Sequence, residues 1–252
     1  MYGESRDDTI IRLEDGRTDV GAVIRTHPNT KGKTSSDWFM RNIINLTVDA
    51  GNNPQADGIQ WYATNTGIIR DVVVRGNGPV GINSSFGVNN NGPNMIEDTI
   101  VDGFETGIRS AWVYGQDLCR VTIRNCRKHG VFVSANAVGI EDLTVENTPT
   151  AVFCQKPNNW THWAGVVSII GGHFTGTDPG QPAIVNKGVL YARDIATSGF
   201  RTVVQGHSKA EAPAGPNITE YNSHPVRKLF ESAPDRALRL PIAKEPRVPW
   251  ET

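Results

Sequence analysis

The order of apolar and polar residues repeats along the middle of the chain. The stretch IRDVVVRGNGPVGINSS at 69–85 resembles IEDTIVDGFETGIRSA at 96–111 and IEDLTVENTPTAVFCQ at 140–155. Each stretch begins with an apolar and a charged residue, continues with Asp and a β-branched run, and reaches a small-apolar pair such as Gly-Ile after a turn. Internal similarity with a period of about 20–50 residues is typical of stacked repeat units.

Seven copies of the motif can be aligned on its third residue. The successive separations between these residues are 26, 27, 22, 22, 29 and 23 positions. The small-apolar pair after the turn, here called the second pair, begins a second short strand in six of the copies. Each period therefore holds two short strands joined by turns of Gly, Asn, Asp and Pro. The residues at the third position are Asn45, Asp71, Asp98, Arg120, Asp142, Gly171 and Asp194. The second pairs are Gly58-Ile59, Gly81-Ile82, Gly107-Ile108, Gly130-Val131, Ala151-Val152 and Ala183-Ile184.

The period is too short for a strand-helix-strand unit, and helical periodicity is absent between 40 and 205. The pattern therefore predicts an all-β chain, a parallel β-solenoid of about seven coils. Strand alternation predicts a core lined by Leu46, Val48, Val72, Val74, Thr99, Val101, Val121, Ile123, Leu143 and Val145. The seventh motif position predicts an outward ladder of alternating charge about 4.8 Å apart, which we interpret as structural: Asp49, Arg75, Asp102, Arg124 and Glu146.

Composition narrows the possible partners. The 252 residues carry a formal net charge of −1, so no basic footprint for nucleic acid is present. No run of 18 apolar residues occurs, and the start MYGESRDDTI lacks the features of a signal peptide, so we expect no membrane partner. The three cysteines, Cys119, Cys126 and Cys154, fall in or beside predicted strands and resemble buried hydrophobic residues. We expect no metal site and no cofactor.

The phrases YGESRDDTIIRLEDG, AGVVSIIGGHFTG and PAIVNKGVLYARDIATSGF resemble the pectate-lyase-like superfamily, and within it glycoside-hydrolase-28-related proteins and family 55 glucanases. The resemblance implies a right-handed, single-stranded parallel β-helix that is extracellular or periplasmic. Family members usually carry a capping helix before the phrase that Gly3 to Leu13 resembles, so we expect a chain truncated at its N-terminus. We expect entry strands with a missing or atypical cap in 1–39, the β-helix in 40–205, and a tail or linker packing on the helix in 206–252. Uncapped ends also predict possible homo-oligomers.

The resemblance implies binding and cleavage of polysaccharides. Family 28 hydrolases carry an Asn-Thr-Asp, Asp-Asp and Gly-His-Gly set that is absent here, and GGH at 171–173 places His173 at an outward position. The clustered calcium-binding Asp and Arg-Pro-Arg of the lyases are absent as well. Three alternatives stay open: a glycoside hydrolase, which family weight favours; a polysaccharide lyase; and a non-catalytic carbohydrate-binding or structural module.

Loops after the second strand of each coil vary most and hold aromatic residues. Aromatic side chains suit the apolar face of a sugar ring, because they combine a flat face with a polar handle. The loops at 111–117 and 155–163 therefore predict one side of a shallow glycan groove. Its substrate-binding aromatics are Trp112, Tyr114, Trp160 and Trp163, with Trp61 at the same end of its own coil.

Titratable residues accompany these loops. Asp117 and Asp57 are the candidate catalytic carboxylates, and strand spacing over two coils predicts about 9–10 Å between them, as in inverting hydrolases. A lyase would instead use Arg109, Lys156 or His162 to remove a proton beside a sugar carboxylate. Arg109 and Lys156 are also candidate substrate-binding residues. The alternative for Asp57, which precedes Gly58, is a turn-closing role. Asp71 and Asp98 form another carboxylate pair that nearby arginines neutralise.

We predict that Trp112→Ala or Trp160→Ala weakens glycan binding while the fold stays intact, because loop side chains contribute little to a core of stacked strands. If Asp117 is catalytic, Asp117→Asn abolishes turnover and spares binding. Equal glycan binding by the wild type and a folded Trp112→Ala/Trp160→Ala variant would contradict the groove.

Overall fold

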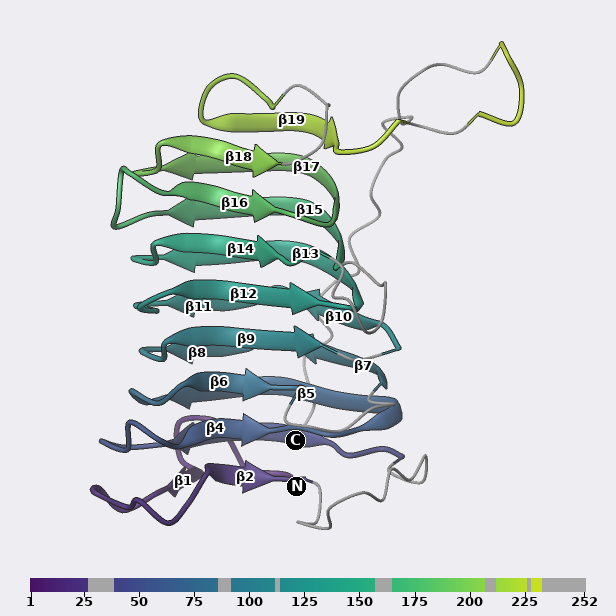
Figure 1. Ribbon diagram of the computed structural model, residues 1–252. Coiled ribbons are helices and arrows are strands. Elements are labelled where there is room, and N and C mark those ends of the chain that lie inside the picture. Colours follow the sequence, from purple (N-terminus) through teal and green to yellow (C-terminus); the bar gives the residue numbers. More distant parts are fainter. Residues whose placement is uncertain are drawn as a thin grey trace.

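The computed structural model describes residues 1–26, 39–85, 92–111, 114–156, 165–206, 212–225 and 228–232. These residues form strands and turns without a helix, and no segment among them is a helix that could span a bilayer. The chain winds so that each coil contributes strands to two sheets, which face each other across a shared core (Figure 1). The predicted β-solenoid is confirmed.

Two sheets make up the stack. The first, called sheet A, has eleven strands: β1 (Ile10–Arg12), β3 (Ile43–Asp49), β5 (Thr64–Arg75), β7 (Gly92–Glu97), β8 (Ile100–Asp102), β10 (Gln116–Cys119), β11 (Thr122–Arg124), β13 (Ala137–Glu146), β15 (Val166–Thr175), β17 (Val189–Ser198) and β19 (Asn217–Asn222). The second, called sheet B, has eight: β2 (Ala22–Arg25), β4 (Asp57–Gln60), β6 (Val80–Asn83), β9 (Thr106–Ala111), β12 (His129–Ser134), β14 (Thr150–Cys154), β16 (Pro182–Asn186) and β18 (Thr202–Gly206).

Neighbouring strands are parallel and in register along most of the stack, with one register shift between Thr64 and Gly67 where β5 pairs with β7. In sheet A, Ile140 of β13 lies beside Leu118 of β10 on one side and Ile169 of β15 on the other. The exception is β19, which pairs antiparallel with β17 at the C-terminal end of the sheet. The seven strands of sheet B from β4 to β18 correspond to the seven predicted copies and span about six turns.

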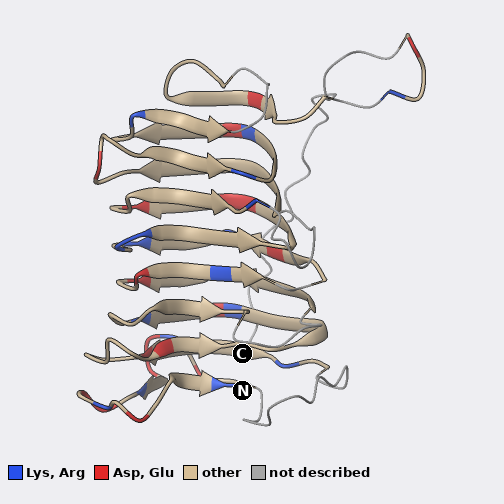
Figure 2. Ribbon diagram, in the orientation of Figure 1, with Lys and Arg blue, Asp and Glu red and all other residues tan. Residues whose placement is uncertain are grey.

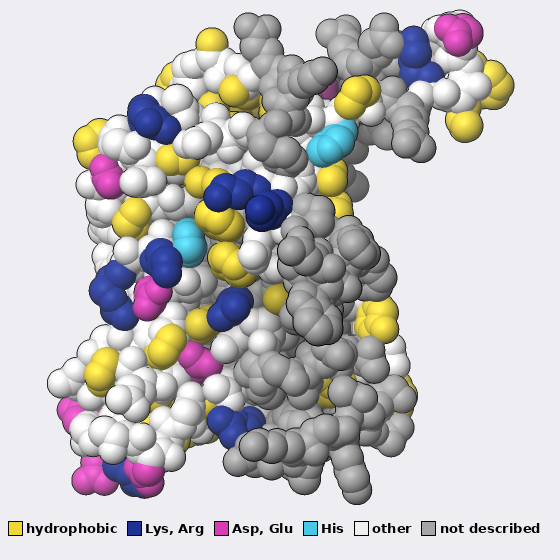
Figure 3. Space-filling view, in the orientation of Figure 1, with side chains coloured by type: hydrophobic (Ala, Val, Ile, Leu, Met, Phe, Trp, Pro, Cys, Tyr) yellow, Lys and Arg dark blue, Asp and Glu magenta, His cyan; other side chains and the backbone are white. Residues whose placement is uncertain are grey.

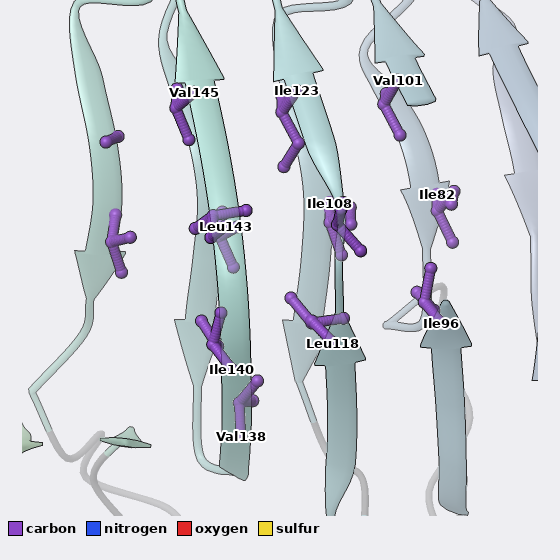
Figure 4. Packing of buried hydrophobic residues seen from close by; sticks show 14 of the residues in the cluster. Ile82, Ile96, Val101, Ile108, Leu118, Ile123, Val138, Ile140, Leu143 and Val145 are labelled. Atoms are coloured by element: carbon purple, nitrogen blue, oxygen red, sulfur yellow. The ribbon is translucent and has the colours of Figure 1, made fainter. Parts of the chain in front are cut away.

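The core lies between the two sheets and consists mainly of stacked aliphatic residues (Figure 4). Every residue that strand alternation predicts to face inward is buried, including Thr99. The second small-apolar pairs supply the opposite wall through Ile59, Ile82, Ile108, Val131, Val152 and Ile184, none of them measurably exposed. The shared core explains why the same β-branched residues recur in each copy, because an inward residue must match those above and below it.

The third motif position marks a sharp bend in each coil. All seven residues there adopt the left-handed conformation, with φ between 46° and 77°. Asn, Asp and Gly tolerate this region best, which is why they occupy six of the seven copies. Arg120 is the exception at φ 51°, and its guanidinium binds Asp98 at 2.9 Å and also Glu97. The backbone conformation at the third motif position thus explains which residue types occur there.

A column of small residues explains the recurring Gly-Ile pair. A β-carbon added to Gly107 would lie 2.4 Å from Ile123 Cγ2 in the facing sheet and 2.7 Å from the carbonyl oxygen of Gly130. Gly58 and Gly81 meet equivalent obstacles, at 2.3 Å from an inward valine in each case. Glycine is therefore needed in these coils because the two sheets approach closely where sheet B begins.

The predicted charge ladder is present at the end of the sheet A strands. Asp49, Arg75, Asp102, Arg124 and Glu146 lie beside one another in register. Arg75 pairs with Asp49 at 2.9 Å and Arg124 with Asp102 at 2.8 Å. Figure 2 shows blue and red alternating along this edge of the stack. Partly exposed ion pairs of this kind contribute about 0–1 kcal/mol each, so they mark the register more than they stabilise it.

The cysteines behave as the sequence predicts. Cys126 and Cys154 are buried, Cys119 is half-buried, and all three are free thiols. Burial raises the pKa of Cys126 to about 12 and the pKa of each of the other two to about 11, so the thiols stay protonated and unreactive.

We predict that Gly107→Ala lowers the free energy of unfolding by about 1–3 kcal/mol, because the new methyl group overpacks against Ile123. Gly21→Ala is the matched control, since its methyl group would meet the flexible ends of two side chains, Arg25 at 3.1 Å and Gln60 at 3.9 Å. Urea unfolding followed by circular dichroism measures both. Equal midpoints for the two variants would contradict close approach of the sheets.

Candidate functional site

Several predicted site residues lie outside the described residues. These are Trp112, Trp160, Trp163 and His162. The groove between the loops at 111–117 and 155–163 therefore stays a prediction. Tyr114 and Lys156, from the same loops, are described and exposed.

Asp117 lies on the outer face of sheet A, in β10, between Met95 and Gly139 of the neighbouring strands. Its carboxylate extends over Gly139, where an added β-carbon would be 2.5 Å from Oδ1. Although the residue is exposed, the surrounding chain partly desolvates its carboxylate and raises the pKa of Asp117. Glycine at 139 is thus the feature that makes room for this carboxylate.

Asp57 is a buried residue at the start of β4 in sheet B. Its carboxylate accepts hydrogen bonds from Asn83 Nδ2 at 2.8 Å, Gln60 Nε2 at 3.0 Å and the backbone N–H of Val80 at 3.1 Å. Burial raises the pKa of Asp57, and these donors oppose that rise. These contacts join β4 to β6 of the next coil.

The two predicted carboxylates lie on different sheets. Strands of sheets A and B cross the coil in opposite directions (Figure 1), so the start of β4 and the start of β10 lie at opposite corners. The expectation that strand spacing alone separates Asp57 from Asp117 is therefore wrong. The number of coils between two residues gives their separation along the stack, but it does not say which sheet or which end of a strand each residue occupies.

Trp61 is also placed differently from the prediction. Its side chain is fully buried, and the indole N–H donates a hydrogen bond to the carbonyl oxygen of Arg41 at 3.1 Å. It packs in the core cluster with Ala63 and Ile69. Trp61 is therefore a core residue and cannot serve as part of an aromatic platform.

The outer face of sheet B brings together a different set of side chains. One outward column runs through Gln60, Asn83, Arg109, Phe132 and Phe153, with one residue from each successive strand. Polar groups occupy its lower half, where Gln60 and Asn83 each donate a hydrogen bond to Asp57. Aromatic rings follow above them, half-buried on the surface of the sheet.

The next residue of this column after Phe153 is Val185, but Lys187, which follows β16, extends its side chain over the Phe153 ring. We call the resulting stack the aromatic-cation strip: Arg109, Phe132, Phe153 and Lys187. The two phenylalanine rings are 5.4 Å apart between centroids and within 8° of parallel. The Arg109 guanidinium lies 5.4 Å from the Phe132 ring, and Lys187 Nζ lies 5.3 Å from the Phe153 ring. Cations over aromatic faces are favourable by about 0.5–1 kcal/mol at exposed sites.

His129 lies beside the strip at the start of β12. Its ring centroid is 4.9 Å from that of Phe153 and 5.8 Å from that of Phe132, tilted in both cases. Burial lowers the pKa of His129 to about 4, helped by the nearby positive charge of Lys128 and opposed by Glu105. The imidazole is therefore neutral at pH 7. Figure 3 shows a cyan histidine with hydrophobic and basic side chains around it on this face, over β12 and β14.

Charge is distributed unequally between the two sheets. The described strands of sheet A contain ten acidic residues, and most of the ion pairs involve them. The described strands of sheet B contain one, the buried Asp57. Arg109 and Lys187 are exposed and form no ion pair with any described residue. The described strands of sheet B therefore present exposed basic side chains and no exposed acidic one.

Sequence reasoning named Arg109 but missed its partners. The signal was present: Phe132 and Phe153 stand directly after the inward Val131 and Val152, at a position that is polar in the preceding coils. Register between coils was needed to see that they stack. Among the described residues, no group of three or more His, Cys, Asp or Glu side chains could hold a metal ion. No family model matches the chain, and no curated protein matches it either.

We predict that His129 destabilises the fold in acid. Its pKa is lower in the folded state than the unfolded value of 6.5, so the unfolded chain binds a proton first as the pH falls. Stability is then lost by up to about 1.4 kcal/mol per pH unit between 6.5 and 4, and by less where solvent reaches the ring. The melting temperature of His129→Gln should fall less between pH 7 and pH 4.5 than that of the wild type.

His173→Gln is the control for this comparison, because His173 is exposed on the outer face of sheet A. The melting temperature of His173→Gln should change between pH 7 and pH 4.5 as that of the wild type does. The same pH dependence in all three proteins would show that His129 titrates normally in the folded state.

Proposed function

We propose that the chain is a polysaccharide-binding β-solenoid and that its ligand lies along the outer face of sheet B. The observation that carries this proposal is the half-buried phenylalanine pair on a regular parallel sheet, flanked by two cations that form no ion pair with a described residue. Aromatic residues and Arg are enriched where proteins bind partners, and a straight sheet face fits an extended polymer. The resemblance to polysaccharide-active β-helices supports the same class of ligand.

Binding without cleavage is the alternative that the contacts favour. Glycoside hydrolysis uses two carboxyl groups, about 5–5.5 Å or 6.5–9.5 Å apart. The carboxylate of Asp57 is buried and accepts three hydrogen bonds, and Asp117 belongs to the other sheet. The strip itself contains no carboxyl group. The four residues of the strip can contact a sugar chain, but none of these four supplies the acid or the base of a hydrolase.

The binding mode differs from sugar stacking on a flat platform. The faces of Phe132 and Phe153 already cover each other, and Arg109 and Lys187 cover the outer faces. Ring edges and the polar groups of the two cations are what the strip offers to a ligand. Sugar hydroxyl groups can accept hydrogen bonds from both cations, while the C–H groups of the sugar contact the ring edges.

We predict that Phe132→Leu/Phe153→Leu weakens binding by roughly three- to tenfold, because the substitution keeps apolar bulk but removes the rings that position the cations. The assay is affinity electrophoresis against a panel of neutral and acidic polysaccharides. Val73→Leu/Ile100→Leu is the matched control, since these half-buried residues lie side by side on the outer face of sheet A. The control should bind like the wild type.

The same panel tests for cleavage by measuring reducing ends and the absorbance of unsaturated products. We expect neither to rise. Equal binding by the wild type and the phenylalanine variant would move the glycan site away from sheet B, and released products would restore the hydrolase or lyase alternative.

A further inference from the structure

The two cations of the aromatic-cation strip are available to a ligand. Arg109 and Lys187 are exposed, and each places its charged group over an aromatic ring. By contrast, Arg75, Arg120 and Arg124 on sheet A each pair with an acidic residue. The two cations of the strip thus form no salt bridge with a described residue, although the buried Asp57 carboxylate interacts electrostatically with Arg109.

The aromatic rings add to the positive character of the strip. An aromatic ring is electron-rich on its faces and electron-poor at its edge. In the strip the faces point along the stack toward each other and toward Arg109 and Lys187, so the edges of Phe132 and Phe153 face outward. The surface between the two cations is thus weakly positive as well. No exposed acidic side chain interrupts it among the described strands of sheet B.

We infer that the strip binds an anionic polysaccharide, with carboxylate or sulfate groups accepting hydrogen bonds from Arg109 and Lys187. This inference rests on the proposed function and specifies its ligand. Guanidinium groups bind carboxylate and sulfate in a bidentate manner, and ammonium groups bind them as compact charges. Both contacts are charge-assisted, and exposed contacts of this kind weaken as salt is added.

The geometry also predicts the direction and minimum length of the ligand. Arg109 lies in β9 and Lys187 directly follows β16, so three strand spacings along β9, β12, β14 and β16 separate them. These spacings amount to about 14 Å. One polymer chain can contact both cations only if it runs along the stack, across the strands. An oligosaccharide shorter than this span reaches one cation, so affinity should rise sharply once the ligand spans both.

The test uses matched polymers that share a backbone and differ in charge: carboxymethyl cellulose with hydroxyethyl cellulose, and dextran sulfate with dextran. Poly-glutamate serves as a polyanion that is not a glycan. The full chain is compared with Arg109→Gln/Lys187→Gln. The control is Arg17→Gln/Arg124→Gln, which removes two positive charges at partly exposed ion pairs elsewhere. Circular dichroism and melting temperature establish that each variant is folded.

We expect the wild type to bind an acidic polymer at least about tenfold more tightly than its neutral partner at low salt. The strip variant should lose this preference, retain the weak binding of the neutral polymer, and show a smaller salt dependence, while the control retains the preference. The carboxylated and sulfated arms show which anion is preferred.

Equal affinity for the acidic and neutral members of both pairs would overturn this inference and leave the glycan-binding proposal standing. Binding of poly-glutamate in place of the glycans would overturn the proposed function but keep an anion site. An unchanged preference in the strip variant would show that the anion binds elsewhere, and absence of binding to every polymer would overturn both proposals.

Discussion

Backbone hydrogen bonding between successive coils is the interaction on which the rest of the structure depends. It holds neighbouring strands about 4.8 Å apart and in register, so equivalent residues of successive coils stack in columns. Each column then meets one physical requirement along its whole height. The inward columns are apolar, the third motif position is left-handed, and the ladder at the end of sheet A alternates in charge. A residue that breaks the rule of its column needs a local remedy, as Arg120 shows with its two acidic partners.

Close approach of the sheets limits where the chain can vary. Glycine occupies the start of sheet B in four coils because a β-carbon there would contact an inward residue of sheet A. The turns leading from sheet A into sheet B are correspondingly short and alike. Variation is left to the connections from sheet B to sheet A and to the outward columns, which do not contribute to the core. Binding chemistry must therefore be sought in those two places.

Stacking also shapes the aromatic-cation strip. Outward side chains in one column lie at the strand spacing, close to the distance at which parallel rings pack, so Phe132 and Phe153 stack on each other rather than presenting flat faces. Arg109 belongs to the same column and lies over Phe132, whereas Lys187 lies two residues beyond the column position of Val185 and reaches the Phe153 ring with its side chain. Sheet A, with acidic residues in most of its strands, neutralises its own cations. The difference between the sheets gives the molecule one face suited to an anionic polymer.

The sequence by itself determined the repeat, the strands, the inward residues and the charge ladder, because each depends on local alternation and on spacing along the chain. It also identified Asp57 as a possible turn residue and Arg109 as a candidate ligand-binding residue. Only the tertiary structure decided which corner of the coil each candidate occupies. Asp57 and Asp117 separate onto different sheets, and Trp61 turns into the core. The stack of Phe132 on Phe153 likewise depends on the register between residues 21 positions apart, which coil lengths alone do not specify since the copies are spaced 22–29 residues apart.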